Sequence, residues 1–288
     1  MRLYYRISDN SYEKHKLIGA TKEVCLMNFC KAFAPVIFGD GPPPEGHVPP
    51  VKVICDNCSR KTIQMVHDTG LPFTLTAEGN AGSLRKALDI AIEECEDDEL
   101  VYFCEDDYLH LGSAPTLLEE GIKRADYVTL YDHPDKYSRY YNGGEYSKVI
   151  RTASSHWRYT ASTCMTFGTK VKKLREDKEI WDEFTSETHP HDHHIFTKLG
   201  EKNRRLAVCI PGVACHVDLT FSSVISTMSI EHWAIQLMID HIENELAEIV
   251  KQNVFRAGEY AELKKSMVVN KKGQERLMAL DAMRQVFK

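Results

Sequence analysis

The sequence predicts an α/β fold with a doubly wound, mostly parallel sheet that carries helices on both faces. Short apolar runs recur along the first two-thirds of the chain, and segments with helical spacing separate several of them. Such runs indicate buried strands, and repeated strand–helix–strand units place their strands in a parallel sheet. The chain of 288 residues is long enough for one or two domains with a full core.

The expected elements follow one another along the chain. We expect strands at 3–8, 36–38, 51–55, 73–77, 100–104, 127–131 and 206–210. Helices are expected at about 21–33, after Ser83, near 116–124 and from Pro190. The helix after Ser83 is the clearest, because apolar residues recur every three or four positions as far as Cys95, with Ser83 as N-cap.

Two domains are predicted, at 1–225 and 226–288. Residues 147–168 are rich in Thr, Ser, Tyr and Trp, which favours extended segments lining a pocket. After residue 226 the apolar residues follow two helical stripes. We therefore expect a helical C-terminal extension that packs on the first domain or forms a homodimer.

Composition excludes several classes of protein. The net charge of −6 argues against a nucleic-acid-binding protein with a broad basic surface. No apolar stretch reaches the length of a membrane span, and the first residues lack the apolar region of a signal peptide. The nine cysteines are an odd number and several lie in expected strands or helices, which is typical of reduced thiols in a cytoplasmic protein. Cys55 and Cys58 form one CxxC without a second pair, so we expect them to serve packing rather than a zinc ribbon.

Three consecutive acids, Glu105, Asp106 and Asp107, directly follow the expected strand 100–104. Like charges in contact repel by about 1 kcal/mol in water and by several times more near a protein surface. A divalent cation or a ligand hydroxyl would relieve that repulsion. Ligands of open α/β sheets bind beyond the carboxyl ends of the strands, which is where these acids would lie. An acidic turn without further function is the alternative.

Two further polar clusters come earlier in the chain. Asp56 and Asn57 end an apolar strand, where they contact a ligand or form an Asx turn. Residues 79–83, which include Asn80 and Ser83, form an expected flexible loop opening a helix whose N–H groups could meet a phosphate or a nucleoside. The patterns of the P-loop and of the Rossmann glycine fingerprint are absent.

Histidines dominate the last cluster, 189–194. Pro190 suits the first position of a helix, which places Asp192 in the first turn, where the helix dipole favours its ionised form. Such a carboxylate is useful as a general base, although it is also common as plain helix stabilisation. His216 follows the strand 206–210; it is either structural or completes a Mn²⁺ or Mg²⁺ shell together with carboxylates and phosphates.

In this order the clusters resemble those of nucleotide-sugar-dependent glycosyltransferases of the GT-A fold, over roughly residues 1–220. The acidic triplet looks like the family's DxD motif in a Glu-Asp-Asp form. The resemblance implies that Asp107 binds Mn²⁺ or Mg²⁺ at the donor diphosphate and that His216 completes the coordination. It also implies that Asp192 deprotonates the acceptor hydroxyl, although Asp192 lies among four histidines rather than in the usual acidic pair.

The resemblance further implies a GT-A-like domain and a set of donor-binding residues. These are Ser8, Asp56, Asn57, Asn80, Ser83, Glu105 and Asp106. The implied reaction is a metal-dependent, inverting transfer of a sugar from a UDP- or GDP-linked donor to a glycan or other hydroxyl acceptor. Residues 132–137 and 155–158 are expected to supply further contacts, and Trp157 either stacks on a sugar or is buried.

Two other functions use the same residue types. His189, His191, Asp192, His193 and His194, together with Asp106 and Asp107, could bind two metals for phosphoester hydrolysis. Contiguous histidines cannot all converge on one ion, which argues against that reading. The third possibility is a non-catalytic protein that binds a nucleotide or a carbohydrate.

Overall fold

The computed structural model describes residues 1–10, 16, 17, 19–39, 46, 48–137 and 144–218. The chain divides into two compact units, one of residues 1–15 and 21–224 and the other of residues 16–20 and 225–288. All the elements below belong to the first unit. The predicted boundary after residue 225, the helical extension and its role in a homodimer fall outside the described residues and stay predictions.

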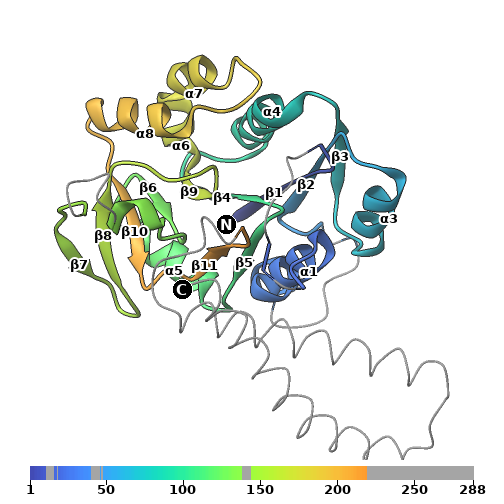
Figure 1. The fold of residues 1–288 in the computed structure, drawn as a ribbon, viewed down its shortest axis with the longest axis horizontal. Helices are drawn as coiled ribbons and strands as arrows, with labels where there is room; N and C mark the ends of the chain where they lie inside the picture. The colour runs from blue at the N-terminus through green and yellow to red at the C-terminus, as the bar shows by residue number, and fades with distance from the viewer. Residues whose placement is uncertain (11–15, 18, 40–45, 47, 138–143, 219–288) are drawn as a thin grey trace, which may run out of the picture. The chain divides into compact units, whose positions relative to one another are not determined.

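A nine-stranded sheet forms the centre of the described part of the first unit (Figure 1). Its strand order is β3-β2-β1-β4-β9-β6-β10-β8-β7. The bounds are β1 Arg2–Ser8, β2 Val51–Asp56, β3 Phe73–Thr76, β4 Leu100–Glu105, β6 Tyr127–Thr129, β7 Val149–Arg151, β8 His156–Thr160, β9 Phe167–Lys170 and β10 Leu206–Ile210. Only β8 and β9 run against the common direction. The prediction of an α/β fold with a mostly parallel sheet is confirmed.

Helices cover both faces of this sheet, as predicted. Their bounds are α1 Lys22–Ala32, α2 Ala34–Phe38, α3 Arg60–Asp68, α4 Gly79–Glu94, α5 Ala114–Gly121, α6 Val171–Glu176, α7 Lys178–Phe184 and α8 Asp192–Glu201, with a 3₁₀ turn η1 at Pro134–Tyr137. Side chains of β1 alternate between the faces: Leu3, Tyr5 and Ile7 pack with α1 and α5, whereas Tyr4 packs with α4 and α6–α8. Figure 1 shows α4, α6, α7 and α8 together on the face opposite α1.

The N-terminal helices differ from the expectation at one place. The Thr21 hydroxyl accepts a hydrogen bond from the Val24 N–H and caps α1, which covers most of the helix predicted at about 21–33. The predicted strand 36–38 is wrong, because these residues complete α2. Pro35 lies in the first turn of that helix, where its fixed φ is favourable, and Ile37 is fully buried.

A two-stranded antiparallel ribbon, which the sequence analysis did not predict, joins β5 (Tyr108–His110) to β11 (Ala214–His216). The chain reaches β11 by passing closely over the end of β6 at Gly212. A Cβ at Gly212 would lie 3.1 Å from both the Asp132 nitrogen and the Leu130 oxygen. The close passage therefore favours glycine, and it brings β11 beside the residues that follow β4.

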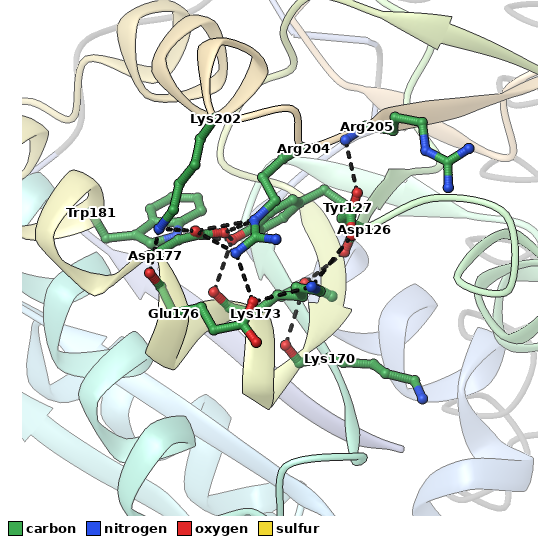
Figure 2. A network of polar contacts seen from close by, with 11 residues as sticks. Asp126, Tyr127, Lys170, Lys173, Glu176, Asp177, Trp181, Lys202, Arg204 and Arg205 are labelled. Carbon is green, nitrogen blue, oxygen red and sulfur yellow. Dashed lines mark hydrogen bonds and ion pairs between the residues drawn. The ribbon is translucent and has the colours of Figure 1, made fainter.

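A buried carboxylate, Asp177, ties the helices of one face to the sheet (Figure 2). It accepts hydrogen bonds from Arg204, at 2.8 Å to Nε, and from the Tyr127 hydroxyl, at 2.9 Å. Lys202 lies 2.7 Å from the same carboxylate. Because Arg204 and Lys202 follow α8 and Tyr127 belongs to β6, this network fixes the C-terminal end of α8.

The remaining predictions on composition and packing can also be compared with the structure. All nine cysteines are free thiols; Cys55 is buried and the Cys58 thiol donates to the Ile7 carbonyl at 3.3 Å, which agrees with a packing role. Trp157 is fully buried, so it does not offer its ring to a sugar. Residues 147–168 contain β7, β8 and part of β9, as extended segments. Within the described residues, no helix combines the length and apolar character needed to cross a bilayer.

Candidate active site

The carboxyl ends of β1, β2 and β4 bring most of the predicted site residues to one edge of the sheet. In the strand register Ser8 lies opposite Asp56, and Arg6 lies opposite Glu105. The parallel arrangement therefore does what the sequence analysis expected of it: it gathers the polar strand ends at one edge.

Glu105 is held by an arginine that the sequence analysis did not select. Arg6 Nη2 lies 2.5 Å from Glu105 Oε1, and Arg6 Nη1 donates to the carbonyl oxygen of Asn80 at 2.8 Å and to the Ser83 hydroxyl at 3.1 Å. Only 5% of Arg6 is exposed. Its position inside an apolar strand, Tyr4-Tyr5-Arg6-Ile7, is the sequence signal that could have identified it.

Asp106 also has a protein cation beside it. Lys22 Nζ lies 2.8 Å from Asp106 Oδ2, and the Ser8 N–H donates to the same oxygen at 3.2 Å. Burial raises the pKa of Asp106 and the neighbouring Asp107 raises it further, while Lys22 and the Ser8 amide lower it. Arg6 and Lys22 therefore compensate the charges of Glu105 and Asp106, a task that the sequence analysis assigned to a metal or a ligand.

Asp107 instead faces His216, the residue predicted to share its metal. Asp107 Oδ2 and His216 Nε2 are 3.3 Å apart, and both side chains are buried. The β5–β11 ribbon places them, because His216 pairs with Tyr108 and the Val217 N–H donates to the Asp107 carbonyl at 2.9 Å. The rings of His216 and Tyr108 pack nearly perpendicular to each other, with centroids 4.9 Å apart. Two predicted metal ligands far apart in the sequence thus lie side by side.

The pair can be tested against the needs of Mn²⁺ or Mg²⁺. Such ions in substrate complexes are held by one or two protein side chains together with phosphates and waters, so one carboxylate and one imidazole fit in number and kind. The Asp218 N–H donates to His216 Nδ1 at 3.1 Å, which assigns the proton of a neutral ring to Nε2. Ligation through Nε2 would therefore require the proton to leave and the contact at Nδ1 to change.

Asp56 caps a helix rather than standing open to a ligand. Its Oδ1 accepts hydrogen bonds from the N–H groups of Glu78 and Gly79, at 2.8 and 3.1 Å, and the side chain is 2% exposed. The Asn57 side chain donates to the other carboxylate oxygen at 2.9 Å, and its backbone has a positive φ of 50°. Asp56, the last residue of β2, thus caps the start of α4 from a different part of the chain.

The expectations for residues 79–83 need correction. These residues form the first turn of α4 rather than a flexible loop, and Ser83 is buried within the helix rather than being its N-cap. The Ala81 N–H donates to the Thr188 carbonyl at 3.3 Å. Together with the two amides bound by Asp56, three donors at this helix end are already engaged, so they do not form the expected phosphate cradle.

Asp192 is the first residue of α8, one position after the N-cap His191. The prediction that it lies in the first turn is confirmed, whereas Pro190 lies before the helix rather than at its first position. Burial raises the pKa of Asp192, and the His193 N–H and the nearby His133, His193 and Lys136 side chains lower it without cancelling the rise. The expected stabilisation of the ionised form by the helix end is therefore outweighed by desolvation.

A network of buried charges lies near Asp192 in the segments 132–137 and 155–158. The fully buried Asp132 accepts from Arg158 at 2.7 Å and from the Tyr137 hydroxyl at 2.5 Å. Lys136 is 3% exposed and donates a hydrogen bond of 2.8 Å to the Ser162 hydroxyl. The same hydroxyl lies 3.3 Å from His193 Nδ1. The sequence analysis expected contacts from these segments but did not identify their internal partners.

The electrostatic environment of Cys164 involves both the start of α8 and the acidic triplet. Burial raises the pKa of the Cys164 thiol, and the charges of Asp192, Glu105 and Asp107 raise it further. One thiol is thus within electrostatic reach of both clusters. Within the described residues, no group of three or more His, Cys, Asp or Glu side chains is arranged to hold a metal ion.

Comparison with known proteins gives structural matches only. No protein-family model and no curated protein matches the chain. Matching solved structures include S. aureus TarS 1–349, with 16% identity and a TM-score of 0.40 over 83% of this chain and 66% of that one. The galactosyltransferase LgtC, solved with donor and acceptor sugar analogs, has 11% identity and a TM-score of 0.41 over 72% and 73%. CMP:2-keto-3-deoxy-manno-octonic acid synthetase with CTP has 11% identity and a TM-score of 0.44 over 83% and 100%.

Proposed function

We propose that this protein is a nucleotide-sugar-dependent glycosyltransferase with a GT-A-like catalytic domain. It would transfer a sugar from a UDP- or GDP-linked donor to a glycan or other hydroxyl acceptor, with inversion. The observation that carries the proposal is the buried Asp107–His216 pair beside the carboxyl end of β4. The half-buried Asp192, which together with Asp107 raises the pKa of Cys164, supplies a candidate base.

In this proposal Asp107 and His216 hold a Mn²⁺ or Mg²⁺ ion. Bound there, the ion would supply positive charge to the diphosphate leaving group. The acids next to Asp107 have a different task. Arg6 and Lys22 hold the carboxylates of Glu105 and Asp106 in place, so Asp106 can accept a hydrogen bond from a donor hydroxyl while Glu105 keeps Arg6 in position.

The acceptor side of the proposed reaction rests on Asp192. A carboxylate with a raised pKa is a stronger base than an exposed one, and it removes a proton from a hydroxyl within hydrogen-bond reach. Ser8, Asn57 and Asn80 remain proposed donor contacts at the strand and helix ends. Asp56, Ser83 and Glu105 would act by positioning, since each binds another part of the protein.

Thermal stabilisation by nucleotides tests the cation site. UDP or GDP, and the matching nucleotide sugars, should raise the melting temperature only with Mn²⁺ or Mg²⁺, and Asp107→Ala should abolish that rise. Asp98→Ala is the matched control, because its side chain is 92% exposed. Stabilisation that persists in Asp107→Ala would remove the proposed cation site.

Product analysis then separates the functions. A glycosyltransferase releases the nucleoside diphosphate in proportion to glycosylated acceptor. Release of pyrophosphate from a nucleoside triphosphate and a sugar would indicate a nucleotidyltransferase instead. Phosphoester cleavage without an acceptor would indicate the hydrolase, and donor binding without turnover across an acceptor panel would indicate a binding protein.

A further inference from the structure

A second concave site lies at the opposite edge of the sheet from the acidic triplet. A pocket of about 520 Å³ is formed where the end of α5 meets β7, β8 and the start of β10. Five cations and one tyrosine supply its polar lining: Lys123, Arg124, Lys148, Arg151, Arg205 and Tyr159. Among the residues that the structure describes, no acidic residue lines it, although the whole chain carries a net charge of −6.

The strand register places this pocket away from the candidate active site. Leu206 at the start of β10 pairs with Tyr127 at the start of β6. Arg124 and Arg205 precede these strands, so they lie at the amino ends. Asp107 and the rest of the triplet lie at or beyond the carboxyl end of β4, which runs in the same direction. Lys148 precedes β7 and Arg151 ends it, and β7 is the last strand of the sheet, beyond β9, β6, β10 and β8 from β4, so the cations of the pocket do not belong to the proposed donor site.

One cation of the pocket is held in a defined position. The Arg205 guanidinium lies 5.7 Å from the centre of the Tyr159 ring, and its Nη1 donates to the Tyr159 hydroxyl at 3.3 Å. That hydroxyl in turn donates to the Arg124 carbonyl at 3.4 Å. A guanidinium stacked on a ring and fixed by a hydrogen bond loses less freedom when it binds a ligand.

The five cations differ from those near the triplet in their partners. Arg6 and Lys22 form ion pairs with the acids they face. Among the residues that the structure describes, none of the five cations of the pocket forms an ion pair. Gathering five like charges around one hollow is unfavourable without an anion, and guanidinium groups match phosphate oxygens in pairs.

We propose that this pocket binds a ligand carrying two or more phosphate groups. A single phosphate can engage two or three cations at once, whereas the lining offers five around one hollow of this size. The site is independent of the proposed transferase reaction. It would recognise a phosphorylated acceptor, a phosphorylated effector or any other ligand with that chemistry.

Calorimetric titration of the full chain with tripolyphosphate tests the proposal, with EDTA present so that no divalent cation is bound. Tripolyphosphate should bind at physiological salt, and inorganic phosphate should bind about tenfold more weakly or worse, since it forgoes at least one charge-assisted hydrogen bond. The double variant Lys148→Glu/Arg151→Glu should weaken binding of tripolyphosphate by about tenfold or more for the same reason. Both residues are exposed, and an unchanged melting temperature and circular dichroism spectrum establish that the variant folds.

Arg60→Glu/Lys61→Glu on α3 is the matched control, because it changes charge equally at two exposed positions. It should bind as the unaltered protein does, and so should Asp107→Ala. Equal weakening in the control, or a loss in Asp107→Ala, would overturn the pocket as the binding site. Equal affinity for phosphate and tripolyphosphate would overturn the ligand class. Pocket-dependent binding to phosphatidylglycerol vesicles without any binding of tripolyphosphate would assign the surface to a membrane instead and overturn the proposal.

Discussion

His216 Nε2 lies 3.3 Å from Asp107 Oδ2, across the ribbon that β5 and β11 form. Nothing in local sequence joins these residues; the ribbon does, together with the close passage of Gly212 over the end of β6. Their contact is the most direct evidence that the late histidine and the acidic triplet belong to one site.

Replacing the histidine should weaken cation binding without unfolding the protein. His216→Gln removes the imidazole but keeps a polar side chain beside Asp107, and we expect Mn²⁺ to bind about tenfold more weakly or worse in the presence of UDP. Titration calorimetry with Mn²⁺ measures this directly. His156→Gln is the control, because His156 is an exposed residue of β8. Equal Mn²⁺ affinity in His216→Gln and His156→Gln would exclude His216 from the cation site.

Gly212→Ala should damage the site more than the fold. The new Cβ would press on two backbone atoms, which cannot rotate away as a side chain can, and overpacking of this kind costs about 1–3 kcal/mol. The shift falls on β11, so transfer activity and UDP–Mn²⁺ stabilisation should fall by more than urea unfolding alone explains. Gly200→Ala in α8 has open space around it and should be neutral or stabilising. Full activity of Gly212→Ala would show that the position of β11 does not matter for the reaction.

Arg6→Met should destabilise the protein strongly, because it leaves the Glu105 carboxylate without its cation. Removing one partner of a buried ion pair costs about 3–5 kcal/mol, and Glu105 is partly exposed, so we expect about 3 kcal/mol. Arg6→Lys keeps the charge but cannot reach Glu105 and α4 together. Its free energy of unfolding should therefore lie between those of the unaltered protein and Arg6→Met. Urea unfolding measures these values. Adding Glu105→Gln to Arg6→Met should recover part of the loss, and no recovery would mean that the pair is not coupled.

The start of α4 shows what the sequence could predict and what it could not. Apolar spacing identified the helix, because that pattern is local. Its beginning at Gly79 depends on Asp56, which comes from another strand and accepts the Glu78 and Gly79 amides. Ser83 was predicted as the cap because no local pattern records a cap supplied from a distance.

The partners of the acidic triplet, like the cap of α4, come from distant parts of the chain and leave no local pattern in the sequence. Three adjacent acids predicted a compensating positive charge, and the sequence analysis favoured a ligand or metal. The structure supplies Arg6 and Lys22, which are 99 and 84 positions away from their partners. The sheet order that brings them together could be expected in outline, but the side-chain pairing could not. The ends of β1, β2 and β4 were therefore predicted to within one residue, and the partners of Glu105 and Asp106 were missed.

Asp177→Asn should lower stability at neutral pH and flatten its acid dependence. Burial raises the pKa of Asp177, but hydrogen bonds from Arg204, Lys202 and Tyr127 outweigh it and hold the pKa below the usual 3.8. A depressed folded pKa gives stability that is present above 3.8 and is lost as pH falls through the folded value. The variant should be about 2–3 kcal/mol less stable than the unaltered protein at pH 7, and this difference should shrink as pH falls through that window. Urea unfolding across pH, with Glu176→Gln on the same arginine as a mild control, measures both.

Asp192→Asn should trade stability against activity. Loss of the proposed general base should lower turnover by about 10²–10⁴-fold, while donor binding with Mn²⁺ should remain because the proposed cation ligands are Asp107 and His216. Since burial raises the pKa of Asp192 above 3.8, ionising it costs folding free energy at neutral pH. The variant should therefore melt higher than the unaltered protein at pH 7, and this gain should vanish as pH falls below 3.8, where both folded and unfolded carboxyls hold a proton. The unaltered enzyme should show an acid limb in kcat/KM at a pKa above that value. Near-normal turnover in Asp192→Asn would place the base on another residue, and a lower melting temperature at pH 7 would contradict the cost of ionising a desolvated carboxyl at the start of α8.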